Sequence, residues 1–116
     1  MAIRHKFNAI RTERDGIRFD SKLEANYCDY LRLKQQDGSI LFFLRQVPIH
    51  VSATVTLRID FVVFYANGEV TFEDTKGIET EAFKIKRKLV EAQFPFRLVI
   101  IKKIPVYVPL HKIINE

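Results

Sequence analysis

The chain of 116 residues is poor in the residue types that mark several protein classes. It has a single cysteine, which excludes an internal disulfide and any zinc site built on several cysteines, so we expect a cytoplasmic protein. No apolar run approaches the roughly 20 residues that cross a bilayer. The N-terminal residues also lack the apolar stretch of a secretory signal, and we therefore expect no membrane association.

Only four prolines and four glycines interrupt the chain, and it contains no internal repeat, low-complexity tract or linker. We therefore expect a single domain over residues 1–116, with a basic hairpin within residues 1–20 and an extended tail over residues 105–116. Hydrophobic residues make up 47% of the chain and charged residues 28%, which is typical of a globular protein and excludes disorder of the whole chain.

Positive charge is concentrated in one quarter of the chain. The net charge is +5, and residues 76–104 hold eight basic and three acidic residues, whereas the other 87 residues hold eleven of each. The whole excess therefore falls within residues 76–104. A basic segment of this kind fits nucleic acid or another polyanion, although many housekeeping domains are equally basic.

The hydrophobic pattern predicts an α/β protein with the order helix, three strands, helix, strand. Ser21 is suited to cap the first helix, and Gly38 ends it. The segment 59–65 is apolar at odd and even positions, which is typical of a sheet covered by helices on both faces. The expected elements are a hairpin around Asp15-Gly16 (10–19), helices over 21–36 and 80–94, and strands over 40–47 (ended by Pro48), 54–65, 69–76 and 97–104.

Three carboxylates and one lysine interrupt otherwise apolar or structured segments. Glu24 lies in the first turn of the first expected helix. Asp60 lies within a strongly apolar strand, where a buried carboxylate is costly without a partner. Asp74 and Lys76 are two residues apart in the next strand, so their side chains share one strand face.

The turn between these two strands decides whether Asp60 and Asp74 can meet. A two-residue loop of Asn67 and Gly68 would put them on opposite faces, whereas a three-residue loop, Ala66–Gly68, would pair them directly with Gly68 in a left-handed conformation. Like charges placed opposite one another destabilise a sheet, so direct pairing implies that a cation lies between them. We predict the three-residue loop, and with it the cross-strand pairs Val62–Phe72 and Phe64–Val70.

Such a group of side chains suits Mg²⁺, which prefers oxygen ligands, with Mn²⁺ as the expected substitute. A bound metal polarises a phosphate oxygen and lowers the pKa of a bound water, so that hydroxide can attack in line. The Lys76 ammonium would stabilise negative charge on the phosphate or orient the water. These residues therefore predict a phosphodiesterase site in which the metal ligands are Glu24, Asp60 and Asp74.

The same residues resemble the motif of the PD-(D/E)XK nuclease superfamily, which includes restriction endonucleases and Holliday-junction resolvases. The motif is Asp60, then Asp74-Thr75-Lys76 fourteen residues on, preceded by Glu24 in a helix. The order of the expected elements is similar to the core of that superfamily. Over residues 8–102 the chain resembles small phage-encoded members, most specifically in residues 15–25, 73–77 and 80–88. The resemblance implies a restriction-endonuclease-like fold, a mixed central sheet flanked by helices.

Position by position, the resemblance also implies roles for single residues. Gln46 matches a glutamine often found near such sites, and is therefore a weaker, supporting candidate. Ile59 departs from the proline that is expected before the first aspartate, a position that is known to vary. The resemblance assigns three metal-binding carboxylates and a catalytic lysine to Glu24, Asp60, Asp74 and Lys76.

Each of these residues also has an ordinary structural explanation. Glu24 stands at capping-box spacing from Ser21 and could bond the backbone at the start of the helix. Asp60 could form an ion pair with a neighbouring cation, as could Asp74 with Lys76. Glu73 would replace Asp74 if the register slipped by one residue, but its spacing to Lys76 is wrong for a shared face, so Asp74 is preferred. Glu73 is kept, like Gln46, as a candidate that supports the site.

The second expected helix carries four basic residues in a short run, Lys84, Lys86, Arg87 and Lys88. Three of them fall on one helix face, where they could contact a phosphate backbone without reading its sequence. A solvated helix face would have the same pattern. Arg14 and Arg18 in the N-terminal hairpin are further candidates for DNA contact.

These observations predict a Mg²⁺-dependent endonuclease that hydrolyses DNA and selects branched structures in the manner of a junction resolvase. Two cuts in a branched substrate favour a symmetric homodimer, and the apolar segment Ile104–Leu110 is a candidate surface for it. The alternatives are a non-catalytic nucleic-acid-binding module and a phage factor that binds a host protein.

Overall fold

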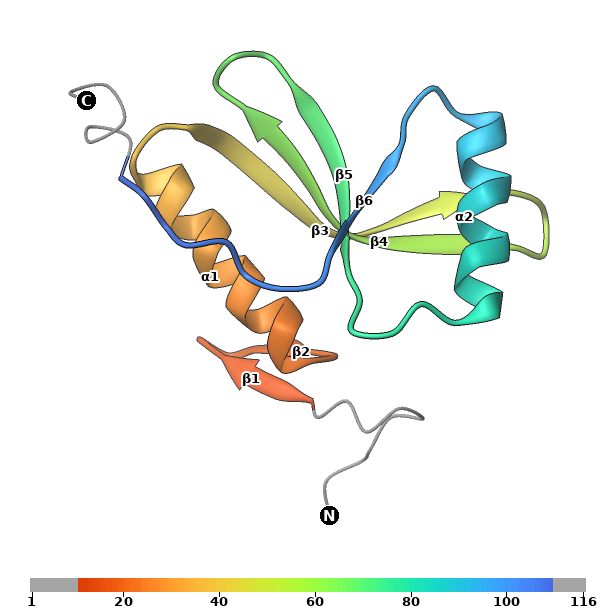
Figure 1. The fold of residues 1–116 in the computed structure, drawn as a ribbon, viewed down its shortest axis with the longest axis horizontal. Coiled ribbons are helices and arrows are strands. Elements are labelled where there is room, and N and C mark those ends of the chain that lie inside the picture. The colour runs from red at the N-terminus through yellow and green to blue at the C-terminus, as the bar shows by residue number, and fades with distance from the viewer. Residues whose placement is uncertain (1–10, 110–116) are drawn as a thin grey trace.

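The computed structural model of the chain describes residues 11–109, which form two helices and two sheets (Figure 1). A short hairpin of β1 (Thr12–Arg14) and β2 (Ile17–Phe19) precedes α1 (Lys22–Gln36). Three antiparallel strands follow, namely β3 (Ile40–His50), β4 (Thr56–Tyr65) and β5 (Val70–Thr75). The chain then forms α2 (Glu81–Gln93) and ends its regular structure with β6 (Leu98–Ile101). The predicted order of helices and strands is therefore confirmed.

The larger sheet has the order β3-β4-β5-β6. The pair β5–β6 is parallel and the other pairs are antiparallel, so the sheet is mixed, as expected for an α/β protein. The crossover from β5 to β6 runs through α2, because a parallel neighbour needs a long connection. None of the helices within residues 11–109 is long and apolar enough to span a membrane.

The prediction that Pro48 ends the first strand of this sheet is wrong. Strand β3 continues through Pro48, which is paired with Arg58 of β4, as far as His50. Because β3 is the edge of the sheet, a residue without an N–H is tolerated there if its missing donor would face outward. The expected strand over 97–104 is shorter in the structure, and residues 102–109 form no regular element.

The predicted register of β4 and β5 is confirmed. Val62 pairs with Phe72, and Phe64 pairs with Val70. The turn has three residues, Ala66–Gly68: the Tyr65 N–H donates to the Glu69 carbonyl, and Gly68 has a φ of +90°, a conformation that favours glycine. This turn places Asp60 opposite Asp74.

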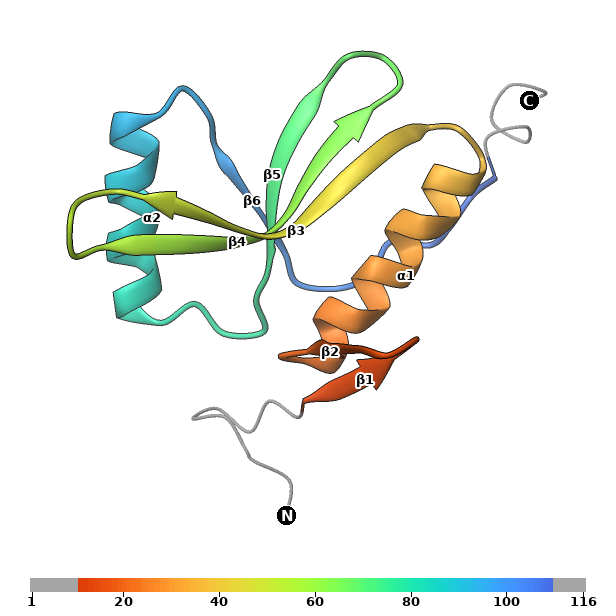
Figure 2. The same cartoon turned by 180° about the vertical axis from the view of Figure 1, so that it is seen from behind.

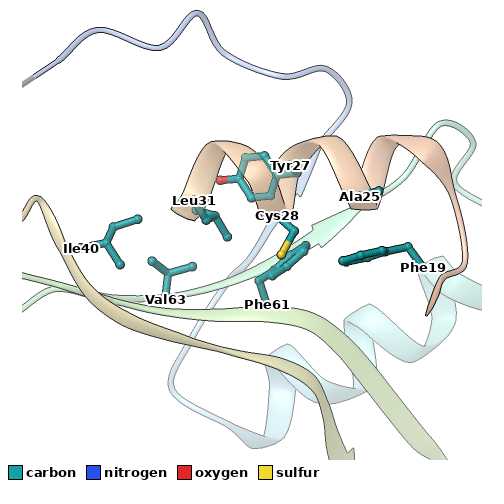
Figure 3. Close-up of a cluster of buried hydrophobic side chains, with 8 residues drawn as sticks. All are labelled: Phe19, Ala25, Tyr27, Cys28, Leu31, Ile40, Phe61 and Val63. Atoms are coloured by element: carbon teal, nitrogen blue, oxygen red, sulfur yellow. The ribbon is translucent and has the colours of Figure 1, made fainter. Parts of the chain in front are cut away.

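The two helices cover different faces of the sheet, because they pack on side chains that alternate along β4. Helix α1 packs on Phe61 and Val63, together with Phe19, in the first of two buried clusters (Figure 3). Helix α2 packs its Phe83 and Val90 on Val62 and others in the second cluster. Seen from behind, the far end of the β3–β4 hairpin lies against α2, away from α1 (Figure 2).

The segment after β6 returns to α1. Ile104 packs on the cluster beneath α1, and the Tyr107 ring meets the Tyr30 ring edge to face at 6.4 Å. The Tyr107 hydroxyl donates to Asp37 near the end of α1, at 2.7 Å. Val106 is 87% exposed. Part of the segment predicted as a dimer surface is therefore used within the chain, and Leu110 at its end lies outside the described residues.

Candidate active site

The candidate site lies where β4 and β5 separate. Their pairing ends at Phe61 and Glu73, and beyond it the two aspartates provide the acceptors that backbone carbonyls would otherwise provide. The Asp74 Oδ1 atom accepts the Asp60 N–H at 3.0 Å. The Asp60 Oδ2 atom accepts the Thr75 N–H at 2.9 Å and the Thr75 hydroxyl at 2.8 Å. Asp60 and Asp74 thus meet, as predicted, and both lie on strands rather than on loops.

Asp74 is the most buried carboxylate of the group, with 1% of the residue exposed. Lys76 Nζ lies 3.2 Å from Asp74 Oδ2, without the alignment of a hydrogen bond, so this buried oxygen accepts no hydrogen bond within the described residues. Burial, and next the negative charge of Asp60, raise the pKa of Asp74 from its ordinary 3.8 to about 7, against the opposing effect of Lys76. Oδ2 is therefore paired with Lys76 by charge but keeps its hydrogen-bonding capacity, which a bound metal ion would use.

Glu24 is buried at the start of α1 and faces the strands. The Ser21 hydroxyl caps the helix by accepting the Glu24 N–H at 3.0 Å, which is one half of a capping box. The Glu24 carboxylate instead accepts from Gln46 at 2.8 Å and from Arg45 at 3.3 Å. Burial, and next the charge of Asp60, raise the pKa of Glu24, while both donors lower it. The helix is therefore capped without the Glu24 side chain, which is directed toward the site.

Gln46 connects the acidic residues. Its Nε2 donates both to Glu24 Oε2 at 2.8 Å and to Asp60 Oδ1 at 3.1 Å. Its φ is +54°, in the left-handed region that non-glycine residues seldom adopt and that is concentrated at functional sites. The structure thus brings together five of the six residues that the sequence places in or beside the site, namely Glu24, Gln46, Asp60, Asp74 and Lys76.

Glu73, the other supporting candidate, lies on the opposite face of β5. Its buried carboxylate accepts hydrogen bonds from the hydroxyls of Tyr27, Tyr65 (3.1 Å) and Thr71 (2.5 Å). Burial, and next the charge of Glu73, raise the pKa of Tyr65 to about 12, so this hydroxyl remains a donor. Glu73 therefore joins β5 to α1 and β4, and it does not contact the site carboxylates.

The carboxylates of the site have the right chemistry to bind a divalent cation. Asp60 and Asp74 are adjacent carboxylates, one with an unused buried oxygen, and carboxylate oxygens are the ligands that Mg²⁺ prefers. In the arrangement described for residues 11–109, however, no three His, Cys, Asp or Glu side chains are grouped as a metal site. The Gln46 amide, which donates to both Glu24 and Asp60, lies between the third carboxylate and the other two.

The basic residues of α2 divide into two kinds. Lys84, Lys86 and Lys88 are exposed. Arg87 is held in place, because it contacts Glu79 and Glu91 at 3.5 and 3.6 Å and donates to the Leu98 carbonyl at 3.2 Å. A surface depression of about 300 Å³ is lined by Glu79, Lys84, Arg87, Lys88 and Glu91.

The two arginines predicted in the N-terminal hairpin also differ. Arg14 pairs with Asp29 of α1, whereas Arg18 is exposed. Arg45, which the sequence analysis did not select, lies within the site, with its guanidinium 4.2 Å from the centre of the Phe19 ring. The only signal in the sequence was its position directly before Gln46.

Comparison with known proteins gives a family but no activity. The family model of DUF1064, described as a protein of unknown function, matches residues 4–108. No curated protein matches the chain, and no solved structure matches it either. The match spans both helices and every strand of the structure.

Proposed function

We propose that this chain, which belongs to the DUF1064 family, is a metal-dependent nuclease with a restriction-endonuclease-like core that hydrolyses phosphodiester bonds in DNA. One observation carries the proposal: Asp60 and Asp74 meet across β4 and β5. The buried Oδ2 atom of Asp74 accepts no hydrogen bond within the described residues and lies 3.2 Å from the Lys76 ammonium. The pKa of Asp74 is raised although Lys76 lies beside it, so Lys76 does not fully compensate these two closely placed carboxylates, and a bound cation would.

The side chains divide the work of phosphodiester hydrolysis. Asp60 and Asp74 would hold Mg²⁺ or Mn²⁺, with Glu24 as the third carboxylate. When bound, the metal supplies a polarised phosphate oxygen and an acidified water. Gln46 orients the carboxylates of Glu24 and Asp60 through its amide. Lys76 stands beside Asp74, where its ammonium would stabilise charge on the phosphate or orient the attacking water.

Charge and size support DNA as the substrate. The net charge is +5, and three lysines on α2 are exposed, so the chain can bind a phosphate backbone without reading bases. A domain of this size offers little surface for a long sequence, which favours recognition of DNA shape. We therefore propose branched DNA as the preferred substrate and a homodimer as the active form, since a branched substrate needs two cuts.

The decisive experiment is a cleavage assay on three substrates: a four-way junction, a supercoiled plasmid and single-stranded DNA. Each is incubated with the wild type, Asp74→Asn and Lys76→Gln, in Mg²⁺, in Mn²⁺ or in EDTA. The matched control is Glu69→Gln, an exposed carboxylate between the turn and β5. We expect metal-dependent cutting by the wild type and the control, and a loss of about 100-fold or more in the two site variants.

The alternatives give different results. Binding of DNA without metal-dependent cutting, equal in all variants, would support a non-catalytic binding module and overturn the nuclease. If the protein cuts the junction but neither the plasmid nor the single strand, the result would support a preference for branched DNA. If all three substrates are cut equally, the nuclease activity would be supported and the preference for branched DNA would be overturned.

A further inference from the structure

Arg45 and Gln46 are consecutive residues of β3, yet both reach the same atom. Arg45 Nη2 lies 3.3 Å and Gln46 Nε2 lies 2.8 Å from Glu24 Oε2. In a regular strand, adjacent side chains point to opposite faces of the sheet. The positive φ of Gln46 breaks this alternation. The backbone thus adopts a costly conformation that brings two donors, rather than one, to the site.

The Arg45 guanidinium is fixed in position but has unused hydrogen-bonding capacity. It stacks over the Phe19 ring at 4.2 Å, and Phe19 is itself buried. Only one of its nitrogens contacts Glu24, while its buried Nε has no hydrogen-bond partner within residues 11–109. A guanidinium has five N–H donors, and 22% of this side chain remains exposed. Arg45 can therefore bind a further anionic ligand without a change in the position of its side chain.

A counter-ion for Glu24 does not by itself account for this arrangement. Glu24 already accepts a hydrogen bond from Gln46, and a half-buried arginine whose buried Nε lacks a partner carries a desolvation cost of its own. An anion with several oxygens would use the N–H donors on the exposed part of the guanidinium, together with its charge. A phosphate fits this description, since planar guanidinium donors match the oxygens of a phosphate.

We propose that Arg45 is a phosphate-binding residue of the candidate site, where its guanidinium contacts a non-bridging oxygen of a DNA phosphodiester beside the carboxylates. This inference rests on the proposed function, because it takes DNA as the ligand. Phe19 holds the guanidinium in place, and Glu24 occupies one of its donors when no DNA is bound. Gln46 is a positioning residue, which acts through its backbone conformation.

The test separates a phosphate contact from a merely structural ion pair. In Glu24→Gln the ion pair is already lost, so a purely structural Arg45 becomes dispensable in that background. We compare Glu24→Gln with Glu24→Gln/Arg45→Gln. The control is Glu24→Gln/Arg32→Gln, which removes one positive charge from the exposed pair of Arg32 and Asp15. Binding of a labelled junction and duplex is measured by fluorescence anisotropy in EDTA over a range of salt concentrations.

We expect Arg45→Gln in this background to weaken binding about tenfold, and to lower the slope of log K against log salt by about 0.9, the value of one phosphate contact. Arg45→Lys is expected to keep the slope and to lose only part of the affinity. Melting curves identify any variant that is unfolded. If Glu24→Gln/Arg45→Gln is unfolded, Glu24→Gln/Arg45→Lys is compared with Glu24→Gln instead.

Equal affinity and equal slope with and without Arg45 would overturn this inference, as would a loss no greater than that of the Arg32 control, or a lysine variant that binds as weakly as glutamine. Cleavage is measured separately with Mg²⁺. A chain that binds through Arg45 but never cuts would overturn the nuclease and leave the phosphate contact. If the chain cuts DNA and its binding does not depend on Arg45, the nuclease is supported and the phosphate contact is overturned.

Discussion

The Asp74 carboxylate accepts the backbone N–H of Asp60 at 3.0 Å, across the point where β4 and β5 separate. Asp60 in turn accepts from the backbone of the residue after Asp74, at 2.9 Å. Two groups that would repel each other are therefore built into the sheet as hydrogen-bond acceptors. The site and the fold share these side chains, so substitutions here are expected to affect both activity and stability.

The first prediction concerns the dependence of stability on pH. The pKa of Asp74 is about 7 in the folded protein against an ordinary 3.8, so the folded state keeps a proton that the unfolded chain releases between these values. Stability should therefore fall as the pH rises from about 4 to about 7, and change little through this group above that range. Urea unfolding of the wild type at several pH values, without divalent metal, measures this.

Asp74→Asn is the matched variant for this prediction, because its amide never ionises. It should lose most of the pH dependence and be more stable than the wild type at pH 8, where the wild-type carboxylate is charged. Glu24, whose pKa is also raised, leaves a smaller dependence in the same direction. A wild type that becomes more stable from pH 4 to pH 7, or a variant with an unchanged slope, would contradict the assignment.

The second prediction concerns metal binding in the absence of DNA. A cation that binds the folded state alone raises the melting temperature with its concentration. At pH 8, millimolar Mg²⁺ or Mn²⁺ should raise the melting temperature of the wild type by about 3 °C or more. Asp74→Asn should show a much smaller shift. No shift in the wild type, or an equal shift in the variant, would count against a metal site at Asp74.

The third prediction separates the two neighbouring acids of β5. Glu73 is 3% exposed and accepts hydrogen bonds from three hydroxyls, so Glu73→Ala leaves those donors unsatisfied and should destabilise the protein by about 2–4 kcal/mol. The folded variant should still cut DNA, because Glu73 lies on the opposite face from Asp74. Urea unfolding and the junction assay measure the two effects. A stable but inactive Glu73→Ala would contradict this division.

The fourth prediction concerns the exposed lysines of α2. Lys84→Gln/Lys88→Gln should lower the slope of log K against log salt by up to about 1.8 for two lost phosphate contacts, with no change in stability. The control is Arg32→Gln/Lys34→Gln, which removes the same charge from α1. An equal loss in both double variants would show that the effect is general electrostatics and that α2 has no particular contact with DNA.

The register of β4 and β5 could be predicted because its determinants are local. Gly68 allows the left-handed end of a three-residue turn, and the apolar alternation of the two strands selects the same pairing. The meeting of Asp60 with Asp74 follows from that register. Ser21 as a helix cap, and Glu24 in the first turn, are likewise properties of a short stretch of sequence.

What could not be predicted depends on residues far apart in the chain. The side chains of Arg45 and Gln46 both reach the Glu24 carboxylate because Gln46 has a left-handed backbone conformation, and no local sequence pattern indicates that conformation. The bonds of Glu73 come from α1, β4 and β5 together. The sequence pattern predicts a strand end at Pro48, but the role of this residue depends on β3 being an edge, which only the assembled sheet determines.

The left-handed backbone conformation of Gln46 has a second effect, on the behaviour of the molecule toward other chains. Strand β3 is an eleven-residue edge, and a long regular edge invites unwanted pairing with another extended peptide. Gln46 departs from extended backbone near the middle of that edge, and Pro48, two residues on, has no N–H to donate. The irregularity that gathers donors at the carboxylates thus also protects the protein against edge-to-edge aggregation.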